Sequence, residues 1–433
     1  MKHSDGPEPR GINRRRLVSI VGGSVGNLVE WYDWFAYASF AIYFAPVFFP
    51  KADPTAQLLS TATIFAAGFV MRPIGAWVMG RFADSRGRKA GLTLSVALMF
   101  SGSLLLAAAP TYARAGLFGP AVLLLARVLQ GLSLGGEYGA SATYLSEMAP
   151  RRNRGFWASF QYMTLCGGQL CAIAVALVLQ AVLTEAELTA WGWRIPFVIG
   201  ALLALAVYLL RRNLAETPSF INQAASRPVS TAARLWRDHR RDSVLVGLLS
   251  AGGGVGAYTF TSYMQKYLFN TVGFTKATAT WIVAAALLWA TAIQPLSGAL
   301  ADRFGRRPLL LVFGIGGAAA AVPVFLLLER TASPTAAALL VMLMLTLHSG
   351  YSANNALVKA ELFPAHIRGL GVALPYAIGN ALFAGTLEMV ALALKGAGHE
   401  RLFYGYVALI IALAGAATLL LPETRERSLI MDD

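Results

Sequence analysis

Long runs of apolar residues constrain the fold of this chain more than any other feature of its sequence. A helix rises 1.5 Å per residue, so roughly 20 apolar residues cross a hydrocarbon core about 30 Å thick. Twelve such runs predict an all-α membrane protein with twelve transmembrane helices. They extend approximately over residues 17–46, 56–80, 90–109, 118–146, 155–183, 192–210, 243–269, 275–300, 308–328, 334–360, 367–394 and 402–421.

Composition and charge agree with a membrane location. Only 13% of the residues are charged, whereas soluble domains have about 25%. The formal net charge is +14, and most Lys and Arg residues fall in the loops on the side of the N-terminus. By the positive-inside rule, both termini and the long central loop are expected in the cytoplasm, in a bacterial-type inner membrane. The basic excess therefore requires no nucleic acid to explain it.

Two motifs occur twice, once in each half of the chain. Gly80–Lys89 is matched by Gly298–Arg307, and Glu147–Gly155 is matched by Glu361–Gly369. Two six-helix halves in the same orientation are the parallel-repeat arrangement of the major facilitator fold. The expected divisions are a cytoplasmic N-terminal tail (1–16), an N-terminal half (17–210), a cytoplasmic linker (211–242), a C-terminal half (243–421) and a cytoplasmic C-terminal tail (422–433).

The repeated motifs lie at helix ends on the expected cytoplasmic side. Asp84 can cap a helix N-terminus, and Arg88 can bridge to a neighbouring helix. Contacts that are made in one conformation and broken in another suit a rocking carrier, and simple tightening of a short loop is the alternative. Gating roles are predicted for Asp84, Arg88, Glu147, Arg154, Asp302, Arg306, Glu361 and Arg368.

Few charged residues lie within the apolar runs, where each costs about 2.5 to 3.5 kcal/mol at the bilayer centre. Glu30 and Asp33 share a face of the first run, and Arg127 and Glu137 lie in the fourth. A carboxylate facing Arg127 would bind a proton when the arginine turns to a substrate anion, so these four residues are predicted to couple protons. Static ion pairs are the alternative, and the structural interpretation is favoured for Glu30 and Glu137.

Other polar residues within the runs form a predicted substrate site. Arg72 precedes Pro73, where we expect a local break in the helix, and a guanidinium suits a carboxylate substrate. An internal partner for Glu30, Asp33 or Glu137 is the alternative role of Arg72. The site is completed by Tyr37, Gln161, Gln169, Tyr263, His348, Asn354, Asn355, Tyr376 and Asn380, each of which could instead hydrogen-bond between helices. Lys266 and Lys359 fall near the ends of runs, where we expect their side chains to reach water.

The sequence contains no enzyme motif in a structural context that would support catalysis. Gly131–Gly135 matches G-x-S-x-G, but a transmembrane helix lacks the strained turn that exposes the serine of a hydrolase. The sequence contains no Walker A loop, no H-E-x-x-H and no zinc-site spacing. We therefore expect no enzymatic activity, no cofactor and no metal.

Most of the chain resembles the metabolite:H+ symporter family of the major facilitator superfamily. The stretches around Asp33, Arg72, Arg127 and Glu137 resemble motifs that recur across that family and imply proton symport. Those around Gln169 and Gln265 are similar to its alpha-ketoglutarate (2-oxoglutarate) permeases. The similar stretches are Gly26–Asp33, Phe69–Gly75, Ala126–Gly131, Gly135–Gly139, Phe160–Leu170, Tyr263–Leu268, Lys359–Pro364 and Ala391–Lys395.

This resemblance implies import of 2-oxoglutarate or a related dicarboxylate together with protons, by alternating access in a lipid bilayer. We expect the chain to act as a monomer. It departs from those permeases at Arg86, at the Asn354–Asn355 pair and at Pro375, which leaves the dicarboxylate open. Two alternatives remain: a proton symporter for citrate, another carboxylate or a zwitterionic osmolyte, and a transporter-like nutrient receptor.

Overall fold

The computed structural model describes residues 14–50, 53–86, 88–148, 151–212, 231–364 and 367–430. Within these ranges, residues 14–26, 80–81, 83–86, 88–92, 136–145, 147–148, 151 and 210–212 are described by their backbone alone. Most of the expected N-terminal tail, half of the linker and the last three residues therefore lie outside the described residues.

Twelve membrane-crossing helices form the body of the protein, as the apolar runs predict. The N-terminal half contains α1 (Arg14–Phe48), α2 (Pro54–Arg86), α3 (Arg88–Ala108), α5 (Phe118–Met148), α6 (Arg154–Val182) and α8 (Ile195–Arg212). The C-terminal half contains α11 with η3 and α12 (Arg240–Asn270), α13 (Lys276–Phe304), α14 with η4 and α15 (Arg306–Arg330), α16 and α17 (Pro334–Ser352, Asn355–Leu362), α18 with η5 and α19 (Arg368–Gly396), and α20 (Glu400–Leu420). Ten of these, all except α1 and α3, meet length and hydropathy criteria for a membrane span within the described residues.

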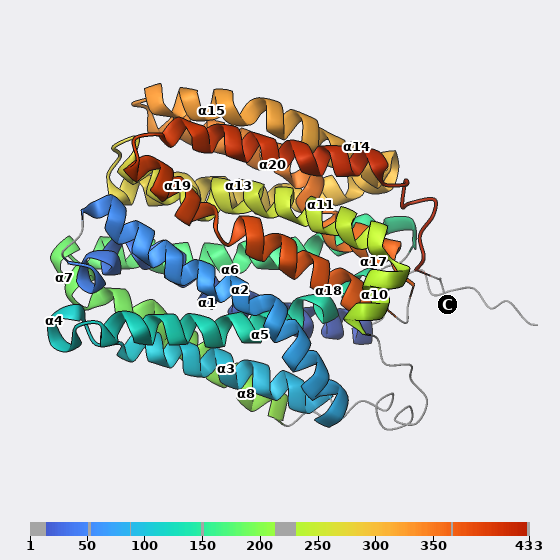
Figure 1. Cartoon of the computed structure of the whole chain (residues 1–433), viewed down its shortest axis with the longest axis horizontal. Helices are drawn as coiled ribbons and strands as arrows, with labels where there is room; N and C mark the ends of the chain where they lie inside the picture. Colours follow the sequence, from blue (N-terminus) through green and yellow to red (C-terminus); the bar gives the residue numbers. More distant parts are fainter. Residues whose placement is uncertain are drawn as a thin grey trace, which may run out of the picture.

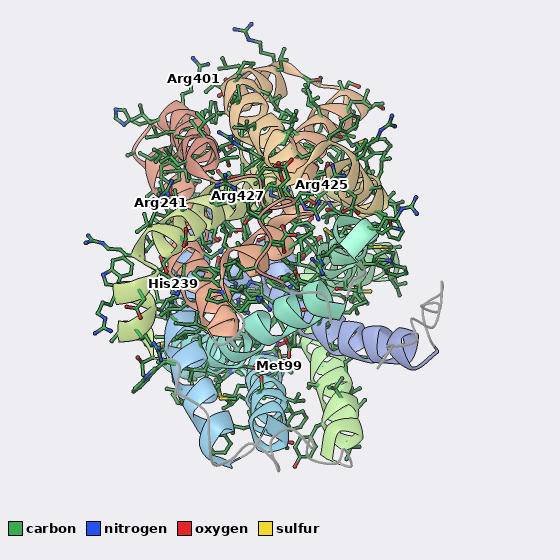
Figure 2. The ribbon with its side chains drawn as sticks, turned by 90° about the vertical axis from the view of Figure 1, so that its right-hand side faces the viewer. Met99, His239, Arg241, Arg401, Arg425 and Arg427 are labelled. Carbon is green, nitrogen blue, oxygen red and sulfur yellow. The ribbon has the colours of Figure 1, made fainter. Side chains whose placement is uncertain are left out.

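Among the described residues, three short α-helices lie outside the bundle and were not predicted from the sequence. These are α4 (Tyr112–Ala115), α7 (Glu185–Ala190) and α10 (Ala232–Asp238). In Figure 1 the long helices run horizontally, with α4 and α7 at the left end and α10 and the C-terminus at the right end. We call these the α7 end and the α10 end of the molecule. Figure 2 views the α10 end, where Arg241, Arg425 and Arg427 are labelled.

Two C-terminal helices next to the centre of the molecule contain a π-helical turn. These turns are η3 (Thr259–Tyr263), which continues α11, and η5 (Asn380–Ala384), which continues α18. A π-helical turn changes which side chains face a given neighbour and is often found at functional sites. In contrast, the break expected at Pro73 is wrong, because α2 is one continuous helix with Pro73 inside it.

Glycines bring α2 and α5 into very close contact. A Cβ atom added at Gly131 would lie 2.1 Å from the carbonyl oxygen of Gly68, and one added at Gly135 would lie 2.0 Å from that of Arg72. Small residues of this kind let transmembrane helices approach until their backbones touch. The tight interface fixes the position of Arg72 relative to Arg127, which lies on the facing helix.

The two halves contact each other at both ends of the molecule. At the α10 end, the carboxylate of Asp302 accepts hydrogen bonds from the backbone N–H groups of Gly155 (2.8 Å) and Phe156 (2.9 Å). At the α7 end, Lys276 forms an ion pair with Glu185, with 2.6 Å between Nζ and Oε1. The two halves are therefore joined at both ends of the molecule.

Candidate functional site

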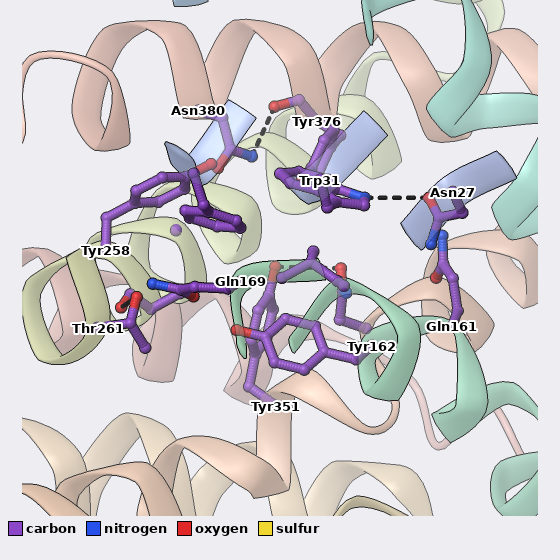
Figure 3. Close-up of a pocket in the computed structure, with 16 residues that line it drawn as sticks. Asn27, Trp31, Gln161, Tyr162, Gln169, Tyr258, Thr261, Tyr351, Tyr376 and Asn380 are labelled. Atoms are coloured by element: carbon purple, nitrogen blue, oxygen red, sulfur yellow. Dashed lines mark hydrogen bonds between the residues drawn. The ribbon is translucent and has the colours of Figure 1, made fainter. Parts of the chain in front are cut away.

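A narrow cavity lies between the two halves. Most of its lining consists of aromatic rings and uncharged polar groups, contributed by α1 and α6 of one half and by α11, η3, α16, α17, α18 and η5 of the other (Figure 3). Its walls are Asn27, Trp31, Phe35, Gln161, Tyr162, Leu165, Gln169, Gly253, Gly254, Ala257, Tyr258, Thr261, Tyr351, Asn355, Tyr376 and Asn380. A concave site with a few convergent polar groups is the usual form of a small-molecule binding site.

Five of the residues predicted to bind substrate line this cavity. Gln161 and Gln169 come from α6, and the C-terminal half contributes Asn355, Tyr376 and Asn380. The Gln169 amide is 3.5 Å from the Ser262 hydroxyl, to which it donates across the two halves. Figure 3 shows the Gln169 side chain extending between Tyr258 and Tyr351. Each half therefore supplies hydrogen-bonding groups to the same space.

Four other predicted residues lie behind the walls of the cavity and form hydrogen bonds or ring contacts there. Tyr37 donates to the carbonyl of Thr61 (3.1 Å), and Asn354 donates to that of Gly350 (3.2 Å). The Tyr263 ring packs against Phe403, with centroids 5.2 Å apart. His348 is bonded through Nε2 to the carbonyl oxygen of Gly253, 3.0 Å away, and Gly253 itself lines the cavity. These contacts are of the inter-helix and helix-stabilising kind.

Arg72 lies directly behind one wall of the cavity. Its guanidinium carbon is 4.1 Å from the ring centroid of Trp34 and 5.5 Å from that of Trp31, which is a lining residue. It also interacts electrostatically with Tyr258 and Tyr376, two further lining residues. Among the described residues, its Nε and Nη2 atoms have no hydrogen-bond acceptor. Buried donors of this kind favour an anionic ligand.

Lys359 supplies a second buried cation, from the other half. Its Nζ atom donates to Asn355 and lies 4.2 Å from the ring centroid of Tyr376. The side chain is 0% exposed, so the expectation that it reaches water is wrong. Lys359 falls at the last turn of an apolar run, and the run does not reveal which way that turn faces. Tyr376 thus interacts with Arg72 and with Lys359.

The expectation that Lys266 reaches water is wrong as well. It is 2% exposed and forms an ion pair with Glu388, which is also 2% exposed. The pair joins α12 to α19 within the C-terminal half. The spacing of these two residues along the chain gives no signal that they meet.

Asp33 and Arg127 face each other, and the amide of Gln130 lies between them. Gln130 donates through Nε2 to Asp33 Oδ2 (2.5 Å), while its Oε1 accepts from Arg127 Nη1 (2.7 Å). Ser103 donates to the other carboxylate oxygen of Asp33 (2.5 Å). Asp33, Arg127 and Gln130 are all 0% exposed. The predicted partners are therefore brought together, but through a bridging amide.

The indole of Trp34 connects this group to Arg72. The guanidinium carbon of Arg127 lies 3.8 Å from the Trp34 ring centroid, and that of Arg72 lies 4.1 Å from it. A cation held against an aromatic face gains about 2 kcal/mol when desolvated. Of the other two predicted coupling residues, Glu30 is buried on α1, and the side chain of Glu137 lies outside the described residues.

Three of the residues predicted to act as gates, Asp302, Arg306 and Glu361, lie together at the α10 end. Arg306 Nη2 lies 3.4 Å from an Asp302 oxygen and 3.6 Å from a Glu361 oxygen. Arg368 donates through Nε to the carbonyl of Phe363 (3.0 Å). Arg154 is buried at the start of α6. Asp84, Arg88 and Glu147 have side chains outside the described residues.

Comparisons with known proteins agree with this geometry. A family model described as "Sugar (and other) transporter" matches residues 19–236 and 221–431. The alpha-ketoglutarate permease of Escherichia coli (strain K12) is 50% identical over 408 residues, which cover 94% of each chain. The citrate-proton symporter of Klebsiella pneumoniae is 32% identical over 406 residues, covering 92% of this chain and 90% of that protein. The structure of a D-xylose-proton symporter superposes with a TM-score of 0.75 at 20% identity, covering 95% of this chain and 99% of that one.

The fold and the enclosed polar site define a multi-pass transporter of the bacterial inner membrane, and not an enzyme. The chain belongs to the Sugar (and other) transporter family of the major facilitator superfamily. The twelve-helix architecture and the family resemblance seen in the sequence are both confirmed.

Proposed function

We propose that this transporter imports 2-oxoglutarate, or a closely related dicarboxylate, together with protons. The observation that carries the proposal is the pair of buried basic side chains, Arg72 and Lys359, which come from different halves and both interact with Tyr376. A relative that is 50% identical to this chain is named for alpha-ketoglutarate. A dianion satisfies two cations in a way that a neutral sugar or a zwitterion does not.

In this proposal, one carboxylate binds the Nε and Nη2 donors of Arg72 and the other binds Nζ of Lys359, which lies 4.2 Å from the ring centroid of Tyr376. Binding then links the N-terminal half to the C-terminal half, because the two cations belong to different halves. A ligand that stabilises the occluded state relative to the open ones favours the passage between them. The polar groups of Gln161, Gln169 and Asn380 are available for the remaining oxygen atoms.

Proton coupling is assigned to Asp33, with Arg127 as its cation. Arg72 and Arg127 both lie against the indole of Trp34. When an anionic substrate binds Arg72, the electrostatic potential at this indole changes, and with it the position that Arg127 prefers. One proton moving through 100 mV supplies about 2.3 kcal/mol, so a dianion needs more than two protons to gain from the potential. Glu30 and Glu137 serve as further proton-coupling positions.

The remaining parts of the proposal concern topology and assembly. The α10 end, with its basic residues, faces the cytoplasm together with both termini, following the positive-inside rule. Residues 17–210 and 243–421 act as the two rocking halves, with 211–242 as the linker. The monomer is the transporting unit, and no nucleic acid takes part. The Asp302–Arg306–Glu361 network and its N-terminal counterpart around Asp84, Arg88 and Glu147 act as gates at that end, with Arg154 and Arg368.

Uptake into proteoliposomes tests the proposal. Purified protein is reconstituted, a pH gradient (acidic outside) is imposed, and labelled 2-oxoglutarate is measured inside against vesicles without a gradient. We expect accumulation above equilibrium that collapses when a protonophore is added. Competition by unlabelled citrate, succinate and betaine identifies the preferred substrate. Binding without any uptake would favour a nutrient receptor, and stronger competition by citrate would favour the substrate named for the Klebsiella relative.

A further inference from the structure

The side chain of Gln130 is the only described contact that joins Asp33 to Arg127 by hydrogen bonds. One amide group serves both partners, because Nε2 donates to Asp33 Oδ2 and Oε1 accepts from Arg127 Nη1. The Gln130 side chain is 0% exposed, and a glycine on the neighbouring helix leaves room for it. A Cβ atom added at Gly102 on α3 would lie 2.7 Å from Gln130 Cγ. Two helices, α3 and α5, therefore hold this amide in place.

We propose that Gln130 is the positioning residue that transmits the protonation state of Asp33 to Arg127. This inference rests on the proposed function, and it names the residue by which the proton and the substrate become coupled. A hydrogen bond to an ionised group is roughly twice as strong as one between neutral groups. Hydrogen bonds in a chain also polarise one another, so an ionised Asp33 strengthens the bond from Arg127 to the Gln130 oxygen.

Protonation of Asp33 weakens both bonds, whichever carboxylate oxygen receives the proton. A proton on Oδ1 turns the Ser103 hydroxyl toward the carbonyl of Met99, 3.1 Å away, and leaves Gln130 donating to a neutral oxygen. A proton on Oδ2 requires the Gln130 amide to reverse, which sets its NH2 group against a donor of Arg127. In both cases Arg127 is held less firmly and can shift within its aromatic enclosure.

No other described side chain around Asp33 links it to Arg127 by hydrogen bonds. The titratable and charged groups that influence the Asp33–Arg127 pair are Tyr32 and Tyr37 on α1, Arg72 on α2, and Tyr258 on α11. From α8 only the backbone of Gly200 approaches, where an added Cβ would lie 2.3 Å from Asp33 Oδ1. Among the described residues, none of these groups hydrogen-bonds to both Asp33 and Arg127.

The test is the pH dependence of 2-oxoglutarate affinity, measured with purified protein in detergent. Coupled sites usually change each other's affinity by about 5- to 150-fold, so the parent is expected to bind at least about fivefold more tightly at acidic than at alkaline pH. Gln130→Met keeps the side-chain volume but has no amide. We expect this variant to bind 2-oxoglutarate at every pH, with an affinity that changes less than about twofold between acidic and alkaline pH. Gln294→Met is the matched control, because it removes another buried amide, one that donates to the Ala290 carbonyl and accepts from Ser352, and it should keep the pH dependence.

Several outcomes would overturn the proposal. Gln130→Met with the pH dependence of the parent would do so, as would an equal loss of that dependence in Gln294→Met. Gln130→Asn, whose shorter side chain cannot span both partners, is a second variant in case the first does not fold, and it is expected to lose the dependence as well. A folded variant that binds at no pH would instead place Gln130 in the binding site. Absence of pH dependence in the parent would overturn the proposed function and this inference together.

Discussion

Replacing Arg72 tests whether this arginine binds the substrate or only stabilises the fold. The guanidinium lies between aromatic rings, with its carbon 4.1 Å from the Trp34 centroid and 4.0 Å from that of Phe69. Its Nε and Nη2 donors have no acceptor among the described residues. Arg72→Met therefore keeps an extended apolar side chain against those rings and removes the donors that the substrate would use.

The expected magnitudes differ between binding and folding. A hydrogen bond to a charged group contributes about 1.5 to 3 kcal/mol, which corresponds to roughly a 10- to 150-fold loss of affinity. Breaking a buried ion pair costs about 3 to 5 kcal/mol of stability. We expect Arg72→Met to show the loss of affinity with a change in unfolding free energy well below that range.

The assay is binding of 2-oxoglutarate by isothermal titration, together with thermal unfolding of the same preparations. Arg194→Met is the matched control, because Arg194 also lies on an aromatic ring, 4.1 Å from the Trp193 centroid, and donates to the carbonyl of Ala109 away from the cavity. Its affinity should equal that of the parent. Unchanged affinity in Arg72→Met, with a stability loss of the size expected for a broken ion pair, would refute the assignment of Arg72 to substrate binding.

Three further predictions concern packing, buried charge and gating. Gly131→Ala places a Cβ 2.1 Å from the Gly68 oxygen and should cost about 1 to 3 kcal/mol of stability. The control Gly167→Ala, whose nearest contact is 3.6 Å away, should have the melting temperature of the parent. Equal melting temperatures of the two variants would contradict the close approach of α2 and α5. Glu388→Gln leaves Lys266 without its carboxylate and should lower the free energy of unfolding by about 3 to 5 kcal/mol. Adding Lys266→Met should restore part of that stability. A single variant as stable as the parent would show that the pair does not form. Asp302→Ala removes the acceptor of the Gly155 and Phe156 N–H groups and should increase labelling of a cysteine introduced into the cavity from the α10 end, whereas unchanged labelling would remove Asp302 from the gate.

Much of the architecture could be predicted from the sequence because apolar length alone specifies a membrane helix. The duplicated motifs at Asp84 and Asp302 further specify two equivalent halves. Charged residues inside apolar runs are rare enough that each one is a candidate, so Asp33, Arg72 and Arg127 could be identified without a structure. Tyr376 and Asn380 were both predicted as substrate-site residues, and both line the cavity.

The remaining features depend on contacts between helices, which a single sequence does not encode locally. Lys359 was assigned to water because it lies in the last turn of an apolar run, although α17 turns that residue toward Tyr376. The role of Gln130 was not predicted, since nothing in its spacing shows that its amide reaches Asp33 on α1. The π-helical turns at Thr259 and Asn380 likewise follow from packing, because no residue pattern marks them.

The central claim is that two cations from opposite halves hold the two ends of one dianion. Its most direct test compares the affinity of 2-oxoglutarate with that of its monoamide, in which one carboxylate is replaced by a neutral group of similar size, for the parent and for Lys359→Gln. We expect the parent to bind the monoamide about tenfold or more weakly, as the loss of one charged hydrogen bond implies, and Lys359→Gln to bind both ligands alike. Equal affinity of the parent for the two compounds would contradict the claim.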